Sequence, residues 1–365
     1  MRYLLVSMFI ATLAMGIVGL ALPLYAEDLG ASYTEIGLLG TFYIIFLVPF
    51  SPFVGRTADR RGRKPLLTFG LFLLASSFIL YIFIESVWWL LVVRLLQGIA
   101  EAPIWVNAQT AIADLSRAEK RGRAMGIYGT SWAFGFAIGP FVGAYLYETI
   151  GAASTFTIGA LVAFLAAFII LAARLPKPYI APRRIRFGEL GPACFIGFVY
   201  VGVVSIILIL FPVYLYKLDM PAVQIGSLVA LFGIVRGVLF IPLGSLSDKH
   251  GPGRVIRLGL FGLVVGSAGL IFTAEYFLLV PIIIILAIAE GSIYPAVMNI
   301  VSKIGGQTSA YVLGIFNGVA MLAWGIVPLL GGFLADAVKP TLPYFMCALI
   351  SFVAFITLRK LFAKR

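Results

Sequence analysis

Apolar stretches of about 20 residues follow one another almost without a break along this chain of 365 residues. A helix of that length crosses the hydrocarbon core of a bilayer, which is about 30 Å thick. Polar positions fall mainly between the stretches and divide the chain into twelve apolar segments. These are residues 4–25, 34–56, 65–84, 87–113, 123–147, 152–173, 192–216, 222–246, 254–273, 277–302, 308–334 and 341–361. The pattern therefore predicts twelve membrane-spanning helices.

The second half of the chain repeats the first. Glycine, aspartate and glycine at positions 55, 59 and 62 recur at positions 244, 248 and 251. The run Ile99-Ala100-Glu101 recurs as Ile288-Ala289-Glu290, again at an offset of 189 residues. In membrane transporters a parallel repeat relates two helix bundles by an axis along the membrane normal, with a binding site between them. We therefore expect an all-α membrane protein made of two six-helix bundles.

One polar connector separates the two repeats. The expected organisation is an N-terminal six-helix bundle over 1–174, a cytoplasmic basic linker over 175–191 and a C-terminal six-helix bundle over 192–365. Proline and basic residues in the connector suit a linker that attracts anionic lipid headgroups, and a regulatory or partner-binding site is the alternative. The other loops are too short to hold a soluble domain with its own core.

Composition and charge fix the environment and the topology. With 62% hydrophobic and 12% charged residues, the chain has too little polar surface for a water-soluble globule. If the N-terminus is cytoplasmic, nearly all basic residues fall in inner loops. Only Lys217 and Lys339 fall outside, while Arg94 and Arg236 lie inside apolar segments. By the positive-inside rule we expect both termini in the cytoplasm, a multi-pass protein of the cell membrane and no nucleic-acid partner for the net charge of +12.

The sequence offers little to enzymatic chemistry. His250 is the single histidine, and Cys194 and Cys347 lie in separate apolar segments. This histidine lies in the expected cytoplasmic loop after the eighth segment, so we expect neither a zinc cluster nor a His-based triad. The sequence also has no G-x4-G-K-S/T motif, which would bind ATP phosphates. We expect no enzyme activity and no bound cofactor or metal.

The loop after the second apolar segment carries a specific motif. Gly55, Asp59, Arg60, Gly62 and Arg63 fit the pattern G-x3-D-R-x-G-R-R/K of the major facilitator superfamily, which the chain resembles over its whole length. The resemblance implies the major facilitator fold with twelve transmembrane helices, in which this loop latches one conformation of the two bundles.

Two further residues extend this gating motif. Asp248 belongs to a degenerate copy of the loop that follows the eighth segment, where the family has it. Asp114 lies at the inner end of the fourth segment, and we expect it to pair with Arg63 or Arg60.

The fifth segment carries a steric motif. Gly135, Gly139, Pro140 and Gly143 form G-x3-G-P-x2-G, which resembles a pattern of the superfamily's antiporters. Small residues four apart let helices approach closely, and proline bends a helix. Generic helix packing is the alternative. By motif, the chain is most similar to the twelve-helix drug:proton antiporters.

Two carboxylates, Glu101 and Glu290, lie in the middle of corresponding apolar segments. Hydrocarbon tolerates a carboxylate only when it is protonated, paired or hydrated. Arg94 and Gln97 match a second family motif, R-x2-Q-G, and Arg94 lies two helical turns before Glu101, about 10 Å away along the axis. We expect Glu101, Glu290 and Arg94 to handle protons. The alternative is structural pairing of Glu290 with Arg236 and of Glu101 with Arg94.

The candidate cavity is apolar with a few polar side chains. The expected substrate-binding residues are Trp105, Asn107, Arg236, Tyr294 and Asn317. Aromatic residues in membrane helices also serve as packing and interface anchors, which is the alternative for each of them.

Together these features predict a secondary active transporter with alternating access, namely a proton-coupled exporter of lipophilic or amphiphilic small molecules. Its expected partners are the small-molecule substrate, protons and membrane lipids, and we expect a monomer. One alternative is proton-coupled uptake of a small metabolite, with Arg94 or Arg236 binding an anionic group. A non-transporting membrane scaffold is a further alternative.

Overall fold

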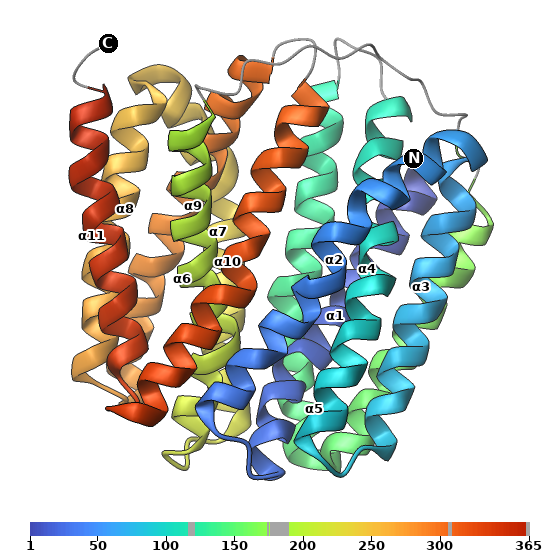
Figure 1. Ribbon diagram of the computed structural model, residues 1–365, viewed down its shortest axis with the longest axis horizontal. Coiled ribbons are helices and arrows are strands. Elements are labelled where there is room, and N and C mark those ends of the chain that lie inside the picture. Colours follow the sequence, from blue (N-terminus) through green and yellow to red (C-terminus); the bar gives the residue numbers. More distant parts are fainter. Residues whose placement is uncertain (116–120, 174, 176–189, 306–308, 363–365) are drawn as a thin grey trace. The chain divides into compact units, whose positions relative to one another are not determined.

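The computed structural model describes residues 1–115, 121–173, 175, 190–305 and 309–362 (Figure 1). Every regular element in these ranges is a helix. They are α1 (Arg2–Asp28), α2 (Tyr33–Arg61), α3 (Arg63–Leu80), η1 (Tyr81–Phe83), α4 (Val87–Leu115), α5 (Arg121–Leu171), α6 (Gly191–Tyr216), α7 (Ala222–His250), α8 (Pro252–Phe272), α9 (Tyr276–Gly305), α10 (Ser309–Ala337) and α11 (Leu342–Phe362).

Within the described ranges, ten helices are long and apolar enough to cross a membrane, and Leu342–Leu358 is a shorter apolar helix. The expected fifth and sixth segments both fall in α5, which is interrupted at Gly151 (φ 82°, ψ 172°). This left-handed backbone favours glycine because a side chain would be strained there. The kink divides α5 into two helices, which correspond to the expected fifth and sixth segments. An all-helical membrane protein is therefore confirmed.

The chain forms two compact units. Unit 1 contains Met1–Ala31, Phe42–Ile180 and Met220–Ala230, and unit 2 contains Ser32–Thr41, Ala181–Asp219 and Leu231–Arg365. The units follow the two sequence repeats except for two short exchanges. The first turns of α2 belong to unit 2, and the first turns of α7 belong to unit 1. The expected linker, 175–191, lies almost entirely outside the described residues.

In unit 1, α5 packs tightly along α1 through the predicted glycine motif. A Cβ atom on Gly139 would lie 2.7 Å from Cα of Gly16, and one on Gly143 would lie 2.2 Å from the carbonyl oxygen of Ile17. Gly135 likewise faces Thr12 of α1, at 2.1 Å from the hydroxyl oxygen. The Ser131 hydroxyl donates a hydrogen bond to the Leu5 carbonyl oxygen at 2.6 Å in the same seam. The motif therefore brings two helix backbones into contact, and Pro140 lies within this seam.

Unit 2 is built in the same way around α6, α8, α9, α10 and α11, with α8 beside α9 and α11 and with α10 beside α6 (Figure 1). Close packing is again made by glycine. A Cβ atom on Gly259 of α8 would lie 2.8 Å from the Ala289 carbonyl oxygen of α9. This seam holds the helix that carries Glu290.

Replacing Gly139 with alanine should destabilise the protein because the added methyl group meets backbone atoms that cannot move aside. We expect a loss of about 1–3 kcal/mol, measured by thermal unfolding of the purified protein in detergent. Gly129→Ala is the matched control in the same helix, since its Cβ atom would have no neighbour nearer than 3.9 Å. Equal stability of the two variants would contradict the steric role.

Candidate functional site

Glu101 is the centre of a hydrogen-bond network buried in unit 1. Its side chain comes from the middle of α4 and is only 4% exposed. One carboxylate oxygen accepts hydrogen bonds from the Tyr43 hydroxyl at 2.6 Å and from Nε1 of Trp105 at 3.0 Å. The other accepts from Nε2 of Gln97 at 2.8 Å. Three neutral donors therefore hold this carboxyl group away from lipid.

Gln97 connects Glu101 to Arg94. The side-chain oxygen of Gln97 accepts from Nη1 of Arg94 at 2.8 Å and from the Tyr81 hydroxyl at 2.9 Å, while its amide nitrogen donates to Glu101. Arg94 is 8% exposed, and its guanidinium carbon lies 5.4 Å from the centre of the Tyr43 ring. The two charged side chains, two turns apart on α4, thus interact through an amide rather than directly.

Sequence reasoning did not assign roles to Gln97, Tyr43 or Tyr81 in this network. For Gln97 a signal existed, because positions three residues after Arg94 and four residues before Glu101 lie on one helix face. The two tyrosines come from α2 and η1, and no local spacing links them to α4.

Glu290 occupies the equivalent position in α9 of unit 2, in a different environment. Its Oε1 lies 3.7 Å from Nη1 of Arg236, which is an ion pair without a hydrogen bond. Among the described residues, neither Oε2 of Glu290 nor Nε of Arg236 has a hydrogen-bond partner, although both atoms are buried. The position equivalent to Arg236 in the first half is Leu47. The repeat therefore pairs the two carboxylates with different cations in different ways.

Aromatic rings lie next to each carboxylate within its own unit. In unit 1, Trp105 stacks on Phe136 with ring centres 6.1 Å apart and meets Trp132 edge-on at 6.2 Å. In unit 2, Tyr294 lies 5.1 Å from Phe240 and 6.4 Å from Tyr200 between ring centres. Each site therefore combines a buried carboxyl group with a partly aromatic wall.

The remaining candidate substrate residues, Asn107 and Asn317, lie in α4 and α10. Asn107 is fully buried, and its amide nitrogen donates to the Pro103 carbonyl oxygen of its own helix at 2.8 Å. Its Oδ1 has no hydrogen-bond partner among the described residues. Asn317 is half-buried in α10. Trp105 lies with Glu101, and Arg236 and Tyr294 lie with Glu290.

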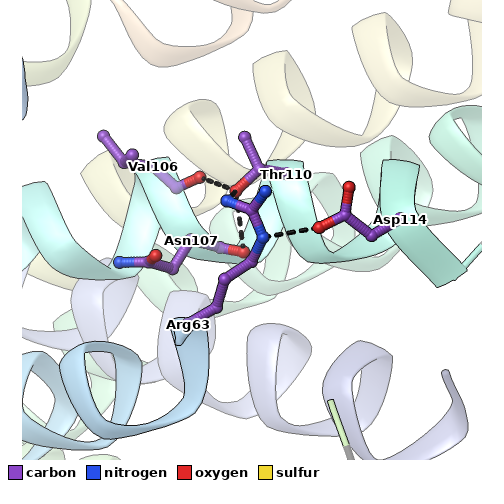
Figure 2. Close-up of polar contacts among 5 residues, drawn as sticks. All are labelled: Arg63, Val106, Asn107, Thr110 and Asp114. Carbon is purple, nitrogen blue, oxygen red and sulfur yellow. Dashed lines mark hydrogen bonds and ion pairs between the residues drawn. The ribbon is translucent and has the colours of Figure 1, made fainter. Parts of the chain in front are cut away.

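The loop motif forms a second polar site at the end of α4 (Figure 2). Nε of Arg63 lies 2.6 Å from Oδ2 of Asp114, and its Nη1 donates to the Thr110 hydroxyl at 2.6 Å. The Thr110 hydroxyl donates in turn to the Val106 carbonyl oxygen at 2.6 Å. Of the two arginines predicted to pair with Asp114, Arg63 makes the contact and is 5% exposed, whereas the side chain of Arg60 is exposed.

Glycine makes the turn of this motif possible. Gly62 has φ 90° between α2 and α3, and its repeat partner Gly251 has φ 86° between α7 and α8. Gly55 lies within α2 and faces Val106 of α4 with ample room. Asp59 is also in α2, and its side chain is outside the described part of the structure.

The degenerate copy in unit 2 has its own contact. Oδ1 of Asp248 accepts a hydrogen bond from Nδ2 of Asn299 at 2.6 Å. Asn299 stands at the position equivalent to Thr110, the partner of Arg63. Both copies therefore tie the loop region to the end of the helix that carries the buried glutamate.

Comparison with known proteins identifies the class. A family model described as Major Facilitator Superfamily matches residues 4–193 and 193–365, and the chain belongs to this superfamily. It is a multi-pass transporter of the plasma membrane and not an enzyme.

Among its relatives, Multidrug resistance protein 1 of Bacillus subtilis is 27% identical over 350 residues, which cover 91% of this chain and 89% of that protein. Multidrug resistance protein MdtG of Dickeya zeae is 29% identical over 301 residues, covering 76% of this chain and 73% of that protein. A crystal structure of the nucleoside transporter NupG matches with a TM-score of 0.84 at 14% identity, covering 99% of each chain. This structural likeness shows the fold.

Replacing Gln97 with leucine should destabilise unit 1 because it removes three hydrogen bonds and leaves buried polar atoms of Arg94, Tyr81 and Glu101 without this partner. We expect a loss of about 2–4 kcal/mol in thermal unfolding. Leu96→Met is the control on the same turn and should change stability by less than about 1.5 kcal/mol. A Gln97→Leu variant as stable as the control would show that the network carries little free energy.

Replacing Asp114 with asparagine should remove the ion pair that Asp114 makes with the buried Arg63. We expect a loss of about 2 kcal/mol, and a double-mutant cycle with Arg63→Leu should give a coupling of at least about 1 kcal/mol. Thermal unfolding of the parent, the two single variants and the double variant measures this coupling free energy. Strictly additive effects would mean that the contact does not stabilise the folded chain.

Proposed function

We propose that this transporter is a proton-coupled exporter of lipophilic or amphiphilic small molecules that works by alternating access. The proposal includes twelve membrane crossings, cytoplasmic termini and a monomer surrounded by lipid. It is supported by relatives named multidrug resistance proteins, which share about a quarter of their residues with this chain. The observation that carries it is the incompletely partnered carboxyl group of Glu290, buried inside a membrane helix.

Glu290 is the better of the two carboxylates for exchanging a proton. When ionised, Glu101 keeps three hydrogen bonds from neutral donors, so gaining a proton would disturb bonds that both of its oxygens already make. Glu290 has one 3.7 Å ion pair and one oxygen without a hydrogen bond among the described residues. Gaining a proton there breaks no hydrogen bond. We therefore assign proton exchange to Glu290 and a positioning role to Glu101, Gln97 and Arg94.

Substrate recognition fits the aromatic walls beside the two carboxylates. Planar or apolar groups can stack on Trp105 and Phe136 or on Tyr294 and Phe240, because these rings are partly exposed. A carboxylate freed of its proton would attract the positive end of an amphiphile. Exclusive occupancy by either a proton or a solute would couple export to proton entry.

The paired Arg63 and Asp114 fit a gating role at the predicted inner side, together with Asp248 and Asn299 in the second repeat. Both contacts join a loop region to a helix carrying a buried glutamate. A change in loop packing would thereby reach the proton site through a rigid helix.

The second candidate is proton-coupled uptake of an anionic metabolite, favoured by one observation. Nε of Arg236 is buried without a hydrogen bond among the described residues, and a proton on Glu290 would leave this arginine free to bind an anion. The two candidates differ in the sign of proton movement. Binding of an exported solute releases protons from the purified protein, whereas binding of an imported anion takes protons up.

Glu290→Gln should abolish transport driven by a pH gradient, because glutamine cannot exchange a proton. In inverted membrane vesicles with an acidic interior, we expect uptake of a fluorescent lipophilic dye to fall at least about tenfold. Exchange of dye without a gradient should be retained. Glu101→Gln should lower both activities together, because it alters the network that positions neighbouring helices.

Glu275→Gln is the control for this series, since Glu275 is an exposed acid. It should transport like the parent protein. Gradient-driven uptake that survives in both the Glu101 and Glu290 variants would refute the carboxylate mechanism and leave the family assignment intact.

A further inference from the structure

Asp336, in the last turn of α10, holds the first turn of α2. Its carboxylate accepts hydrogen bonds from the backbone N–H groups of Tyr33 at 3.0 Å and Thr34 at 2.7 Å, and from the Thr34 hydroxyl at 2.5 Å. All three residues belong to unit 2. Figure 1 shows this end of α2 beside the end of α10. One acidic side chain therefore makes three bonds to a helix start more than 300 residues away in sequence.

Glu148 makes the equivalent contact in unit 1. Its Oε2 accepts a hydrogen bond from the backbone N–H of Val223, in the first turn of α7, at 2.8 Å. Thr34 and Val223 are equivalent at the repeat offset of 189, and Glu148 and Asp336 differ by 188. The same 188-residue offset relates Pro140 of α5 to Pro328 of α10. The two contacts are therefore copies of one arrangement.

Asp336 caps α2 from another helix, because it accepts from the Tyr33 and Thr34 N–H groups, which the local cap does not reach. The first N–H groups of a helix lack intrahelical partners and favour a negative charge. The start of α2 already has a local cap, because Glu35 accepts from the Ser32 N–H at 2.9 Å and the Ser32 hydroxyl accepts from the Glu35 N–H at 3.2 Å. Asp336 adds three hydrogen bonds between separate helices, and these bonds are broken if α2 and α10 separate.

Close helix packing accompanies both contacts. A Cβ atom on Gly37 of α2 would lie 2.3 Å from the Pro328 carbonyl oxygen of α10, and one on Gly226 of α7 would lie 2.4 Å from Cβ of Ala144 of α5. Gly37 and Gly226 are again equivalent positions. Such backbone contact is made in full or lost, because a partial separation leaves gaps on both sides.

Both contacts involve the segments that are exchanged between the two units. Only residues 32–41 of the α2 region belong to unit 2, and only residues 220–230 of the α7 region belong to unit 1, while the rest of each helix belongs to the other unit. A conformational change that returns either segment to the unit of its own helix must first break the acidic contact. Each acid therefore bonds a helix start that belongs to its own unit, while the rest of that helix belongs to the other unit.

We propose that Asp336 and Glu148 are a pair of clasps that stabilise the conformation in which the first turns of α2 and α7 are packed on α10 and α5. Asp336, with three bonds, is the stronger clasp and Glu148, with one, the weaker. The inference rests on the alternating access of the proposed function, and it places the clasps on the side predicted to face outward.

Hydrogen exchange of the backbone amides, followed by mass spectrometry on the full chain in detergent, tests the clasps without substrate or a proton gradient. Asp336→Asn should speed exchange about threefold to tenfold over residues 33–41 and also along the end of α10. Glu148→Gln should have a smaller effect, centred on residues 222–230. Thr34→Val removes only the hydroxyl bond and should lie between the parent and Asp336→Asn.

Glu35→Gln is the matched control, because it weakens the local cap of the same helix without touching α10. Its effect should stay within the first turn of α2. An effect of Asp336→Asn confined to that turn, or no effect, would overturn the proposal. The exchange assay does not depend on transport, so the two proposals can fail separately. Faster exchange in Asp336→Asn, together with transport by the parent protein that does not respond to the proton gradient, would support the clasps and refute the proposed coupling. Unchanged exchange in Asp336→Asn, together with proton-driven transport by the parent protein, would refute the clasps and support the coupling.

Discussion

Hydrocarbon supplies no hydrogen bonds, and this constraint governs every polar group in the molecule. Backbone groups meet it by forming helices, so every regular element in the described part of the chain is helical. Charged side chains meet it by finding partners inside the protein. Arg94 does so through Gln97, and Arg63 through Asp114 and Thr110. The polar sites are therefore few and closely defined.

The two halves meet the same constraint to different degrees. Around Glu101, donors from α2 and α4 complete the hydrogen bonding of both oxygens. Around Glu290, a single long ion pair leaves one oxygen and one guanidinium nitrogen without hydrogen bonds among the described residues. Nε of Arg94 likewise has no hydrogen bond among the described residues, so the two halves differ in the carboxyl group: both oxygens of Glu101 are hydrogen-bonded, whereas Oε2 of Glu290 is not. A buried carboxylate oxygen without a hydrogen bond is unfavourable for stability alone and is the kind of group that chemistry or binding retains.

Glycine residues allow close contact between helices, and acidic side chains bind the helix ends near one of these contacts. Glycine in α5 places its backbone against α1, and Gly37 does the same for α2 against α10. Near the second of these seams, Asp336 adds charge-assisted bonds to the start of α2. Packing and electrostatics thus act together where α2 meets α10.

Much of this protein follows from its sequence alone. Apolar length predicts the helices because a membrane span needs about 20 residues, and the repeat offset identifies the equivalent glutamates. The spacing places Arg94 and Glu101 on one face of α4, where Gln97 connects them, and Asp114 contacts Arg63, one of the two arginines expected to pair with it.

Tertiary structure alone decided which partners these groups have. It selected Arg63 over Arg60, brought Tyr43 and Tyr81 to the α4 network, and assigned the starts of α2 and α7 to the units opposite to their own helices. The reason is physical. Helices that are apolar on every side have no distinct apolar face, so their sequence does not indicate which side packs against which neighbour. Their rotation and contacts are set by packing between segments far apart in the chain, and sequence spacing does not record it.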